Sequence, residues 1–226
     1  ASYSNAGTVR NGYVYGGNIL VGSGVFGGDS SGSRGSVGGL VGTNSGQVYN
    51  CFTLNQVQIE KGENMNSVGL AVGSNSGRVR NVLSVGDVYM YEYDDDKKQT
   101  TPQPLLDYGG TVGYGGGTIK DIYLLSEGNF AYGQNGGSAY KKAELIEART
   151  LRSASWHQSC FNSEGAFEVE NMVQAGYYPR LSLPDALMSK QTTIGLPLVG
   201  ISAYPDIISS TVREEGRDEQ GRDYAL

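Results

Sequence analysis

One stretch near the N-terminus carries residue types that serve in hydrolysis. Gly28-Asp29-Ser30-Ser31-Gly32 fits Gly-x-Ser-x-Gly, the pattern that exposes a nucleophilic serine on a sharp turn between a strand and a helix. The following residues, 33–36, read Ser-Arg-Gly-Ser and begin no helix. The only histidine, His157, comes after the serine, whereas the trypsin-like order requires it before. We therefore expect a loop here. A hydrolase that uses Ser30 and His157 would need both side chains within hydrogen-bond reach, and we expect them to be far apart.

A second glycine pattern resembles a dinucleotide site. Residues 22–27 spell Gly-x-Gly-x-x-Gly after the apolar residues 19–21. Such a site needs a helix that begins at the glycines and an acidic residue about 20 positions later. Residues 27–29 are Gly-Gly-Asp, which is a poor helix start, and residues 41–43 hold no acid. In a chain with 35 glycines the match indicates chance.

The sequence offers few ligands for a metal ion. Zinc proteases use His-Glu-x-x-His, but His157 is followed by Gln158 and Ser159. His157, which is next to Trp156, is predicted to have a structural role. Residues 94–96 are three adjacent aspartates, which lack the alternating spacing and the glycine of a calcium loop. We predict no catalytic residue, no metal site and no cofactor in this chain.

Internal repeats organise the chain. Each copy has a short apolar stretch, a turn of small residues, and a second stretch that alternates apolar with polar residues. Copies occupy residues 38–52, 69–83 and 109–123, and the second half of another covers residues 5–13. Alternation with a period of two predicts strands on both sides of each turn. Because isolated hairpins are only marginally stable, we expect the copies to stack in an all-β solenoid.

Equivalent positions in the copies predict where side chains point. Val48, Val79 and Ile119 are expected to face inward, and Cys51 occupies the position of Val82 and Ile122, which places it in the core. Asn50, Asn81 and Asp121 also recur, and stacking would place them in a hydrogen-bonded ladder. The turn glycines, such as Gly46 and Gly77, are expected to allow positive φ. A disulfide between Cys51 and Cys160 remains open.

The longest excursion from the repeat runs over residues 89–107. Tyr89, Tyr91 and Tyr93 alternate with other residues as in a strand, and the polar residues 94–102 interrupt the pattern. A projecting hairpin or loop fits both halves. Because tyrosine offers a large contact area at low entropic cost, these three residues are the candidate protein-binding residues. The alternative is a half-buried strand that packs on the flank of the solenoid.

The sequence divides into three parts: a solenoid over residues 1–137, a helical and aromatic cap over 138–183, and a linker with the start of a β-rich segment over 184–226. In the cap, residues 141–151 predict a helix with Leu145, Ala148 and Leu151 on one side and Ser138 as the N-cap. We expect this cap to close the end of the solenoid. In the last part, residues 185–190 predict a helical turn, residues 207–212 a strand, and residues 213–223 a turn or a disordered end.

Composition excludes some partners. A net charge of −6 argues against nucleic acid, which requires a basic face. No run of about 18 apolar residues is present, so no membrane span is predicted. The chain begins within a repeat and shows no targeting segment, so we expect a piece of a longer protein. We expect it to be a monomer.

The repeats resemble the GLUG motif, on the match of Gly39-Leu40-Val41-Gly42 through Asn50-Cys51-Phe52. The resemblance covers residues 1–130 by repeat. It extends through Gly176-Tyr177-Tyr178-Pro179-Arg180-Leu181, which is similar to the usual end of GLUG regions, although Met172 stands where a tryptophan is common. GLUG repeats occur in secreted and surface proteins of bacteria, both in adhesin-like arrays and in large zinc metalloproteases that cleave immunoglobulin A.

The resemblance implies a non-catalytic module of a secreted or surface-attached bacterial metalloprotease. The module would serve as a spacer and as a surface that binds a host protein or glycoprotein such as an immunoglobulin. The zinc would belong to a catalytic domain of the parent protein, beyond Leu226. The alternative is an adhesin or structural stalk with no associated enzyme, in which further repeats would follow.

Overall fold

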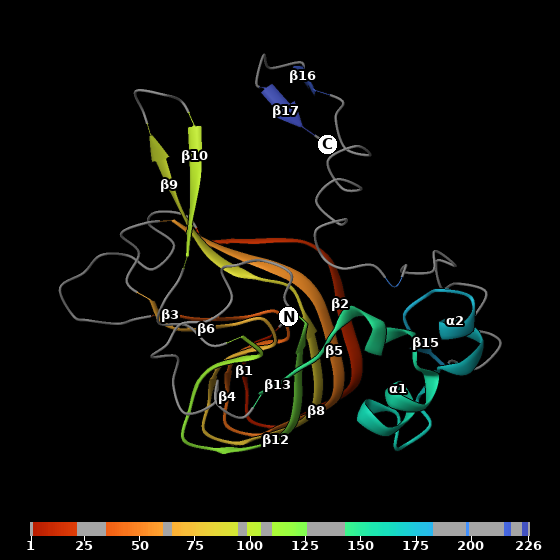
Figure 1. Ribbon diagram of the computed structural model, residues 1–226. Coiled ribbons are helices and arrows are strands. Elements are labelled where there is room, and N and C mark those ends of the chain that lie inside the picture. The colour runs from red at the N-terminus through yellow and green to blue at the C-terminus, as the bar shows by residue number, and fades with distance from the viewer. Residues whose placement is uncertain are drawn as a thin grey trace.

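The computed structural model describes residues 2–21, 35–60, 65–94, 99–104, 110–125, 143–182, 198, 215–217 and 223–225. Within these residues the chain is mostly β-strand, and its two α-helices are short. The strands form parallel sheets through which the chain passes once in each copy of the repeat (Figure 1). The all-β class is therefore confirmed.

Each copy contributes a strand, a turn and a second strand. The first strands are β1 (Ser2–Asn5), β4 (Val41–Asn44), β7 (Val72–Asn75) and β11 (Val112–Gly115). The second strands are β2 (Thr8–Val21), β5 (Gln47–Glu60), β8 (Arg78–Val85) and β12 (Thr118–Leu125). Each strand pairs in parallel with its equivalent in the next copy, so that Gln47 lies between Thr8 and Arg78. The copies thus pair with one another rather than as independent hairpins.

Smaller pairings complete the strand layers. β3 (Gly35–Gly38) pairs in parallel with β6 (Met65–Gly69), ahead of the copies that begin at residues 38 and 69. Beyond the turn at Gly86, β9 (Val88–Asp94) continues the pairing of β8 with β5. β9 then forms an antiparallel hairpin with β10 (Gln99–Pro104), which confirms a hairpin at the predicted position.

The interior is the apolar core that the repeat predicts. Val48, Val79 and Cys51 are fully buried, and Ile119 is 7% exposed. They pack in one cluster with Val41, Val72 and Val112 of the first strands. Cys51 lies opposite Val82, as the equivalence of the copies predicts.

Two rows of asparagines cross the copies. Asn50 Nδ2 donates to Asn11 Oδ1 at 3.2 Å, and Asn81 Nδ2 donates to Asn50 Oδ1 at 2.9 Å, which confirms the predicted ladder for Asn50 and Asn81. Their φ angles lie near +53°, a region that asparagine enters more readily than most residues. A second row was not predicted: Asn5 Nδ2 donates to Asn44 Oδ1 at 2.8 Å, and Asn44 Nδ2 donates to Asn75 Oδ1 at 2.7 Å.

The helix predicted over residues 141–151 is wrong. β13 (Ala143–Leu145) instead pairs in parallel with β12 and extends the sheet. A 3-10 helix, η2 (Ala148–Arg152), and α1 (Ala154–Phe161) follow. Pairing satisfies the open edge of β12, and this tertiary contact outweighs the helix propensity of the segment. The N-cap of α1 is Ser153, whose Oγ accepts from the Trp156 backbone N–H at 3.3 Å; Ser138 lies outside the described residues.

The helices of this segment cover the outer face of the second sheet. α1, β14 (Phe167–Glu168), α2 (Glu170–Gln174) and β15 (Arg180–Leu181) form this layer, which lies beside β5 and β8 in Figure 1. Phe161 packs on Phe52 of β5, with ring centroids 5.4 Å apart. Leu83 of β8 and Leu125 of β12 join the same cluster. These outward positions are apolar, so they require a cover.

Besides Leu198, the C-terminal part is described at β16 (Glu215–Arg217) and β17 (Asp223–Ala225), which pair as an antiparallel hairpin within the region predicted to hold a turn. The predicted helical turn at residues 185–190 and the predicted strand at residues 207–212 lie outside the described residues. Among the helices that the structure describes, none has the length and hydropathy of a membrane span.

Candidate functional site

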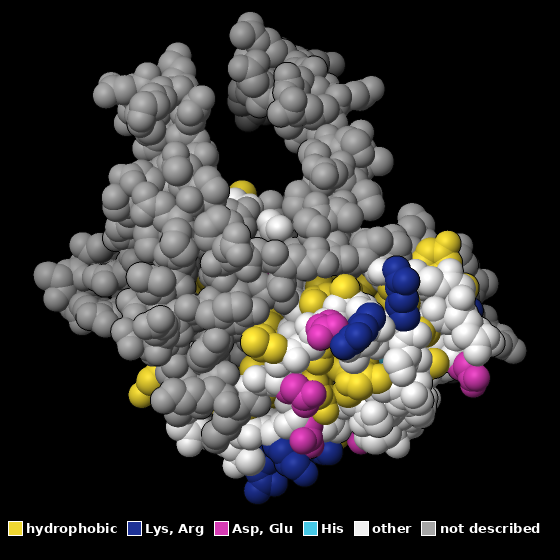
Figure 2. Space-filling view, viewed as in Figure 1, with side chains coloured by type: hydrophobic (Ala, Val, Ile, Leu, Met, Phe, Trp, Pro, Cys, Tyr) yellow, Lys and Arg dark blue, Asp and Glu magenta, His cyan; other side chains and the backbone are white. Residues whose placement is uncertain are grey.

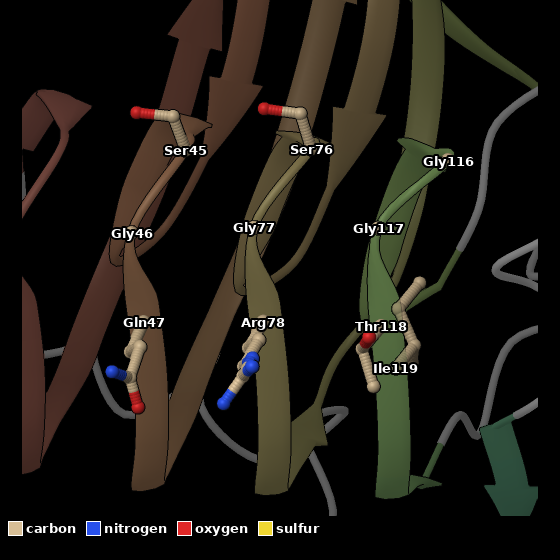
Figure 3. A pocket seen from close by; sticks show the side chains of 10 residues that line it. All are labelled: Ser45, Gly46, Gln47, Ser76, Gly77, Arg78, Gly116, Gly117, Thr118 and Ile119. Atoms are coloured by element: carbon tan, nitrogen blue, oxygen red, sulfur yellow. The ribbon is translucent and has the colours of Figure 1, made fainter.

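A groove crosses the turns of three successive copies (Figure 3). It is lined by residues 45–47, 76–78 and 116–119. Ser45 and Ser76 lie side by side and point the same way, and Gln47 and Arg78 form a parallel row below them. Because the copies pair in register, chemically similar groups repeat across the groove at the strand spacing of about 4.8 Å.

Glycines form the floor of the groove, for a reason other than the predicted one. Gly46, Gly77 and Gly117 do not have positive φ, so that prediction is wrong. A Cβ on Gly46 would instead lie 2.0 Å from the carbonyl oxygen of Gly7, and one on Gly77 would lie 2.1 Å from that of Gly46. The turns approach one another so closely that only glycine fits.

The backbone donors of the groove are already used. The N–H groups of Ser45 and Gly46 both donate to the carbonyl of Asn5, at 2.8 and 3.1 Å, and Ser76 and Gly77 repeat this with Asn44. The serine hydroxyls also donate to these carbonyls, at 3.2 and 3.4 Å. A ligand would therefore meet hydroxyl oxygens, the Gln47 amide and the Arg78 guanidinium.

A basic row lies next to the groove on β2, β5, β8 and β12. Three of its residues are cations, Arg10, Arg80 and Lys120. Tyr49 lies between Arg10 and Arg80, and the four residues pair in register from strand to strand. The Arg80 guanidinium lies 4.4 Å from the centre of the Tyr49 ring, and Arg10 Nη1 lies 3.3 Å from the Tyr49 hydroxyl, which raises the pKa of Arg10. Figure 2 shows basic side chains gathered at the foot of the view, where β8 and β12 begin.

Two carboxylates border the row. Glu164, in the turn after α1, lies 3.4 Å from Arg10 Nη1 and accepts from Asn11 Nδ2 at 2.9 Å. Asp121 lies 3.5 Å from Lys120 Nζ. Arg78 and Arg80 contact no carboxylate among the residues that the structure describes, so they are the most available cations of the row.

The candidate binding residues Tyr89, Tyr91 and Tyr93 lie on β9. Their backbone pairs with β10, where Tyr89 opposes Pro104 and Tyr93 opposes Thr100. Their side chains lie outside the described residues, so the choice between a recognition surface and a packed strand stays a prediction.

His157 has the structural environment that the sequence predicts. It is fully buried, and its Nε2 donates to the Leu151 carbonyl at 2.7 Å, since a carbonyl can only accept. Nδ1 is then the unprotonated nitrogen, and it has no partner among the described residues. Burial lowers the pKa of His157 to about 4. Ser30 and the Gly-rich stretch of residues 22–27 lie outside the described residues.

The two cysteines are free, which resolves the open disulfide. Cys51 belongs to the interior, whereas Cys160 belongs to the cluster under the helical layer. Burial raises the pKa of each thiol to about 11. Neither sulfur is therefore a reactive thiolate at neutral pH.

Metal ligands do not converge in the described part of the chain, where no three residues of His, Cys, Asp or Glu group together. Of the three adjacent aspartates, Asp94 ends β9, and Asp95 and Asp96 lie outside the described residues.

Sequence reasoning missed the groove and the basic row. The signal was present, because aligned copies place Arg78 beside Gln47 and Thr118, and Arg80 beside Tyr49 and Lys120. Reading each copy alone conceals it, since the row exists only across copies.

Comparison of the chain with models of protein families, with curated proteins and with solved structures gives no match.

Proposed function

We propose that the chain is a β-solenoid module built from GLUG-type repeats. In support, equivalent asparagines pair across 39 residues between the first two copies and across 31 residues between the next two. The loops between copies therefore differ in length, but the register between equivalent strands stays the same. A solenoid buries its apolar residues coil against coil, as the rows of Val48 and Val79 do.

The module acts as a non-catalytic spacer and protein-binding surface of a large secreted or surface-attached bacterial metalloprotease of the immunoglobulin A protease type. Zinc chemistry belongs to another domain of that parent. A non-catalytic role is supported by the environment of His157, the sole histidine, which lies buried among aromatic rings.

The observation that carries the binding role is the β9–β10 hairpin. Its base pairs with β5 through Val88–Tyr91, whereas residues 92–94 pair only with β10 among the described strands. The hairpin projects beyond the strands of the parallel sheets in Figure 1 and holds the three tyrosines at alternate positions. It is the part of the module best placed to grip a protein without disturbing the core.

Surface plasmon resonance with immunoglobulin A tests this role, with an unrelated glycoprotein as the specificity control. We expect specific micromolar binding, and we expect a variant with Tyr89→Ser, Tyr91→Ser and Tyr93→Ser to bind at least about tenfold more weakly, because large aromatic contacts dominate interface energies. Its melting temperature should equal that of the wild type.

The matched control removes three exposed tyrosines elsewhere, through Tyr3→Ser, Tyr15→Ser and Tyr114→Ser. This control should bind as the wild type does. Absence of binding by the wild type would favour an adhesin or structural stalk. A large decrease in the melting temperature of the hairpin variant would indicate that the three substituted tyrosines belong to the core.

A further inference from the structure

The groove and the basic row form one continuous outer surface. Arg78 lines the groove, and Arg80 lies two residues later on β8, so both side chains leave the same face of the strand. Both are exposed. The surface therefore combines a straight line of hydroxyl and amide groups with a parallel line of cations, and both lines run across the strands.

The charge of this surface is opposite to that of the whole chain. The chain carries a net charge of −6, yet four cations, Arg10, Arg78, Arg80 and Lys120, lie on neighbouring strands here. Arg10 and Lys120 at the ends face Glu164 and Asp121, which leaves the central pair on β8 for a ligand. Stacking on Tyr49 holds the Arg80 guanidinium in place, which lowers the entropic cost of using it.

We propose that this surface binds an extended polyanionic polysaccharide. The polymer lies along the groove and across the strands. Its sulfate or carboxylate groups contact Arg78 and Arg80, and its hydroxyls donate to the oxygens of Ser45, Ser76 and Gln47. This binding is independent of the β9–β10 hairpin, so it goes beyond the protein-binding role proposed above.

The hydrogen bonds of the groove favour a polysaccharide over a peptide. An extended peptide is usually bound by adding a strand to a sheet, which needs free backbone N–H and C=O groups. The N–H groups of Ser45, Gly46 and Gln47 all donate to the preceding copy, and the next copy repeats the pattern. Side-chain hydroxyl, amide and guanidinium groups remain, and these are the groups that recognise sugar hydroxyls and acidic substituents.

Isothermal titration calorimetry of the full chain tests the proposal with heparin as a sulfated polymer, alginate as a carboxylated one and dextran as a neutral one. We expect heparin or alginate to bind and dextran not to bind. A variant with Arg78→Gln and Arg80→Gln should bind roughly tenfold more weakly, since each exposed ion pair contributes modestly to affinity. The slope of log K against log salt should also fall by about one for each cation removed.

The matched control carries Arg149→Gln and Arg152→Gln, which remove the same charge from the exposed side of η2. It should keep the wild-type affinity, and both variants should keep the wild-type melting temperature because all four side chains are exposed. Equal weakening in both variants would show a response to net charge alone and would overturn the proposal.

Two further outcomes would also overturn it. One is the absence of binding to both acidic polysaccharides at low salt. The other is equally tight binding of poly-L-glutamate with the same dependence on Arg78 and Arg80, which would assign the surface to acidic peptides instead. Failure of the immunoglobulin test would leave these results unaffected, because the hairpin and the groove carry separate variants.

Discussion

At the scale of single residues, positive φ occurs at positions of the repeat other than the turn glycines for which it was predicted. At the equivalent positions of the copies, the positive φ angles fall on Asn11, Asn50, Asn81 and Asp121, each four residues after a turn glycine. The turn glycines are required by the preceding copy, because a Cβ on Gly46 or Gly77 would clash with the backbone of that copy. The spacing of these residues was therefore predictable from one copy, but the reason for each residue type depends on contact between copies.

Gly46→Ala should lower the free energy of unfolding by about 2–3 kcal/mol, because its Cβ would meet fixed backbone atoms of the preceding turn. Gly116→Ala is the control, since no atom of the described residues lies within 4 Å of the position its Cβ would take, and we expect a change within about 0.5 kcal/mol. Urea denaturation measures both. Similar values for the two variants would contradict the close approach of the turns.

At the scale of elements, the strands were predictable and the helices were not. The strands of the repeats have the period-two pattern of their own copy, and that pattern is local. Residues 143–145 lack such a pattern and become a strand only because β12 offers an unpaired edge. Backbone pairing thus outweighs the helical periodicity of this segment. The helix that does form, α1, begins at Ala154, and the hydroxyl of Ser153 caps its N-terminus.

Two leucines on the expected helix test this correction. Leu151 is 1% exposed in the cluster under the helical layer, whereas Leu145 on β13 is 56% exposed. Leu151→Ala should cost about 2–5 kcal/mol of unfolding free energy, and Leu145→Ala should cost less than about 1 kcal/mol. Thermal and urea unfolding measure both. A continuous helix with both leucines on its buried side would give two large losses instead.

At the scale of the whole molecule, the sequence predicted that the copies pair with one another, but it did not predict the layer that covers their flank. Phe52, Leu83 and Tyr123 are aligned outward on β5, β8 and β12, and this apolar row requires a cover on the flank. An argument from repeats alone directs the helical segment to the end of the stack. The row becomes visible only when the copies are aligned, as with the basic row nearby.

The covering layer should make the fold sensitive to acid. The pKa of His157 is lowered to about 4 by burial, so between pH 6.5 and pH 4 the unfolded chain binds a proton that the folded chain does not. The free energy of unfolding should therefore decrease as the pH is lowered through this window, by up to about 1.4 kcal/mol for each pH unit. Above pH 6.5 this contribution is constant.

Urea titrations at several pH values between 7 and 4 measure this effect against His157→Phe. The variant cannot bind the proton, and its ring suits the surrounding Trp156 and Phe161. The carboxylates titrate in both proteins. The difference between the two slopes of unfolding free energy against pH therefore gives the contribution of the histidine. Parallel slopes would show that His157 is accessible to protons in the folded state.

The parallel pairing of the copies also gives the molecule a mechanical direction. The backbone hydrogen bonds between β2, β5, β8 and β12 point along the line on which the copies follow one another. Tension between the first and last copies loads these bonds one strand at a time, so that the copies peel away in sequence at low force. Tension between the two ends of a single strand loads all its bonds together in shear and meets much greater resistance. A tether made of such copies lengthens in steps under load. In each step one copy unfolds while the remaining copies stay folded.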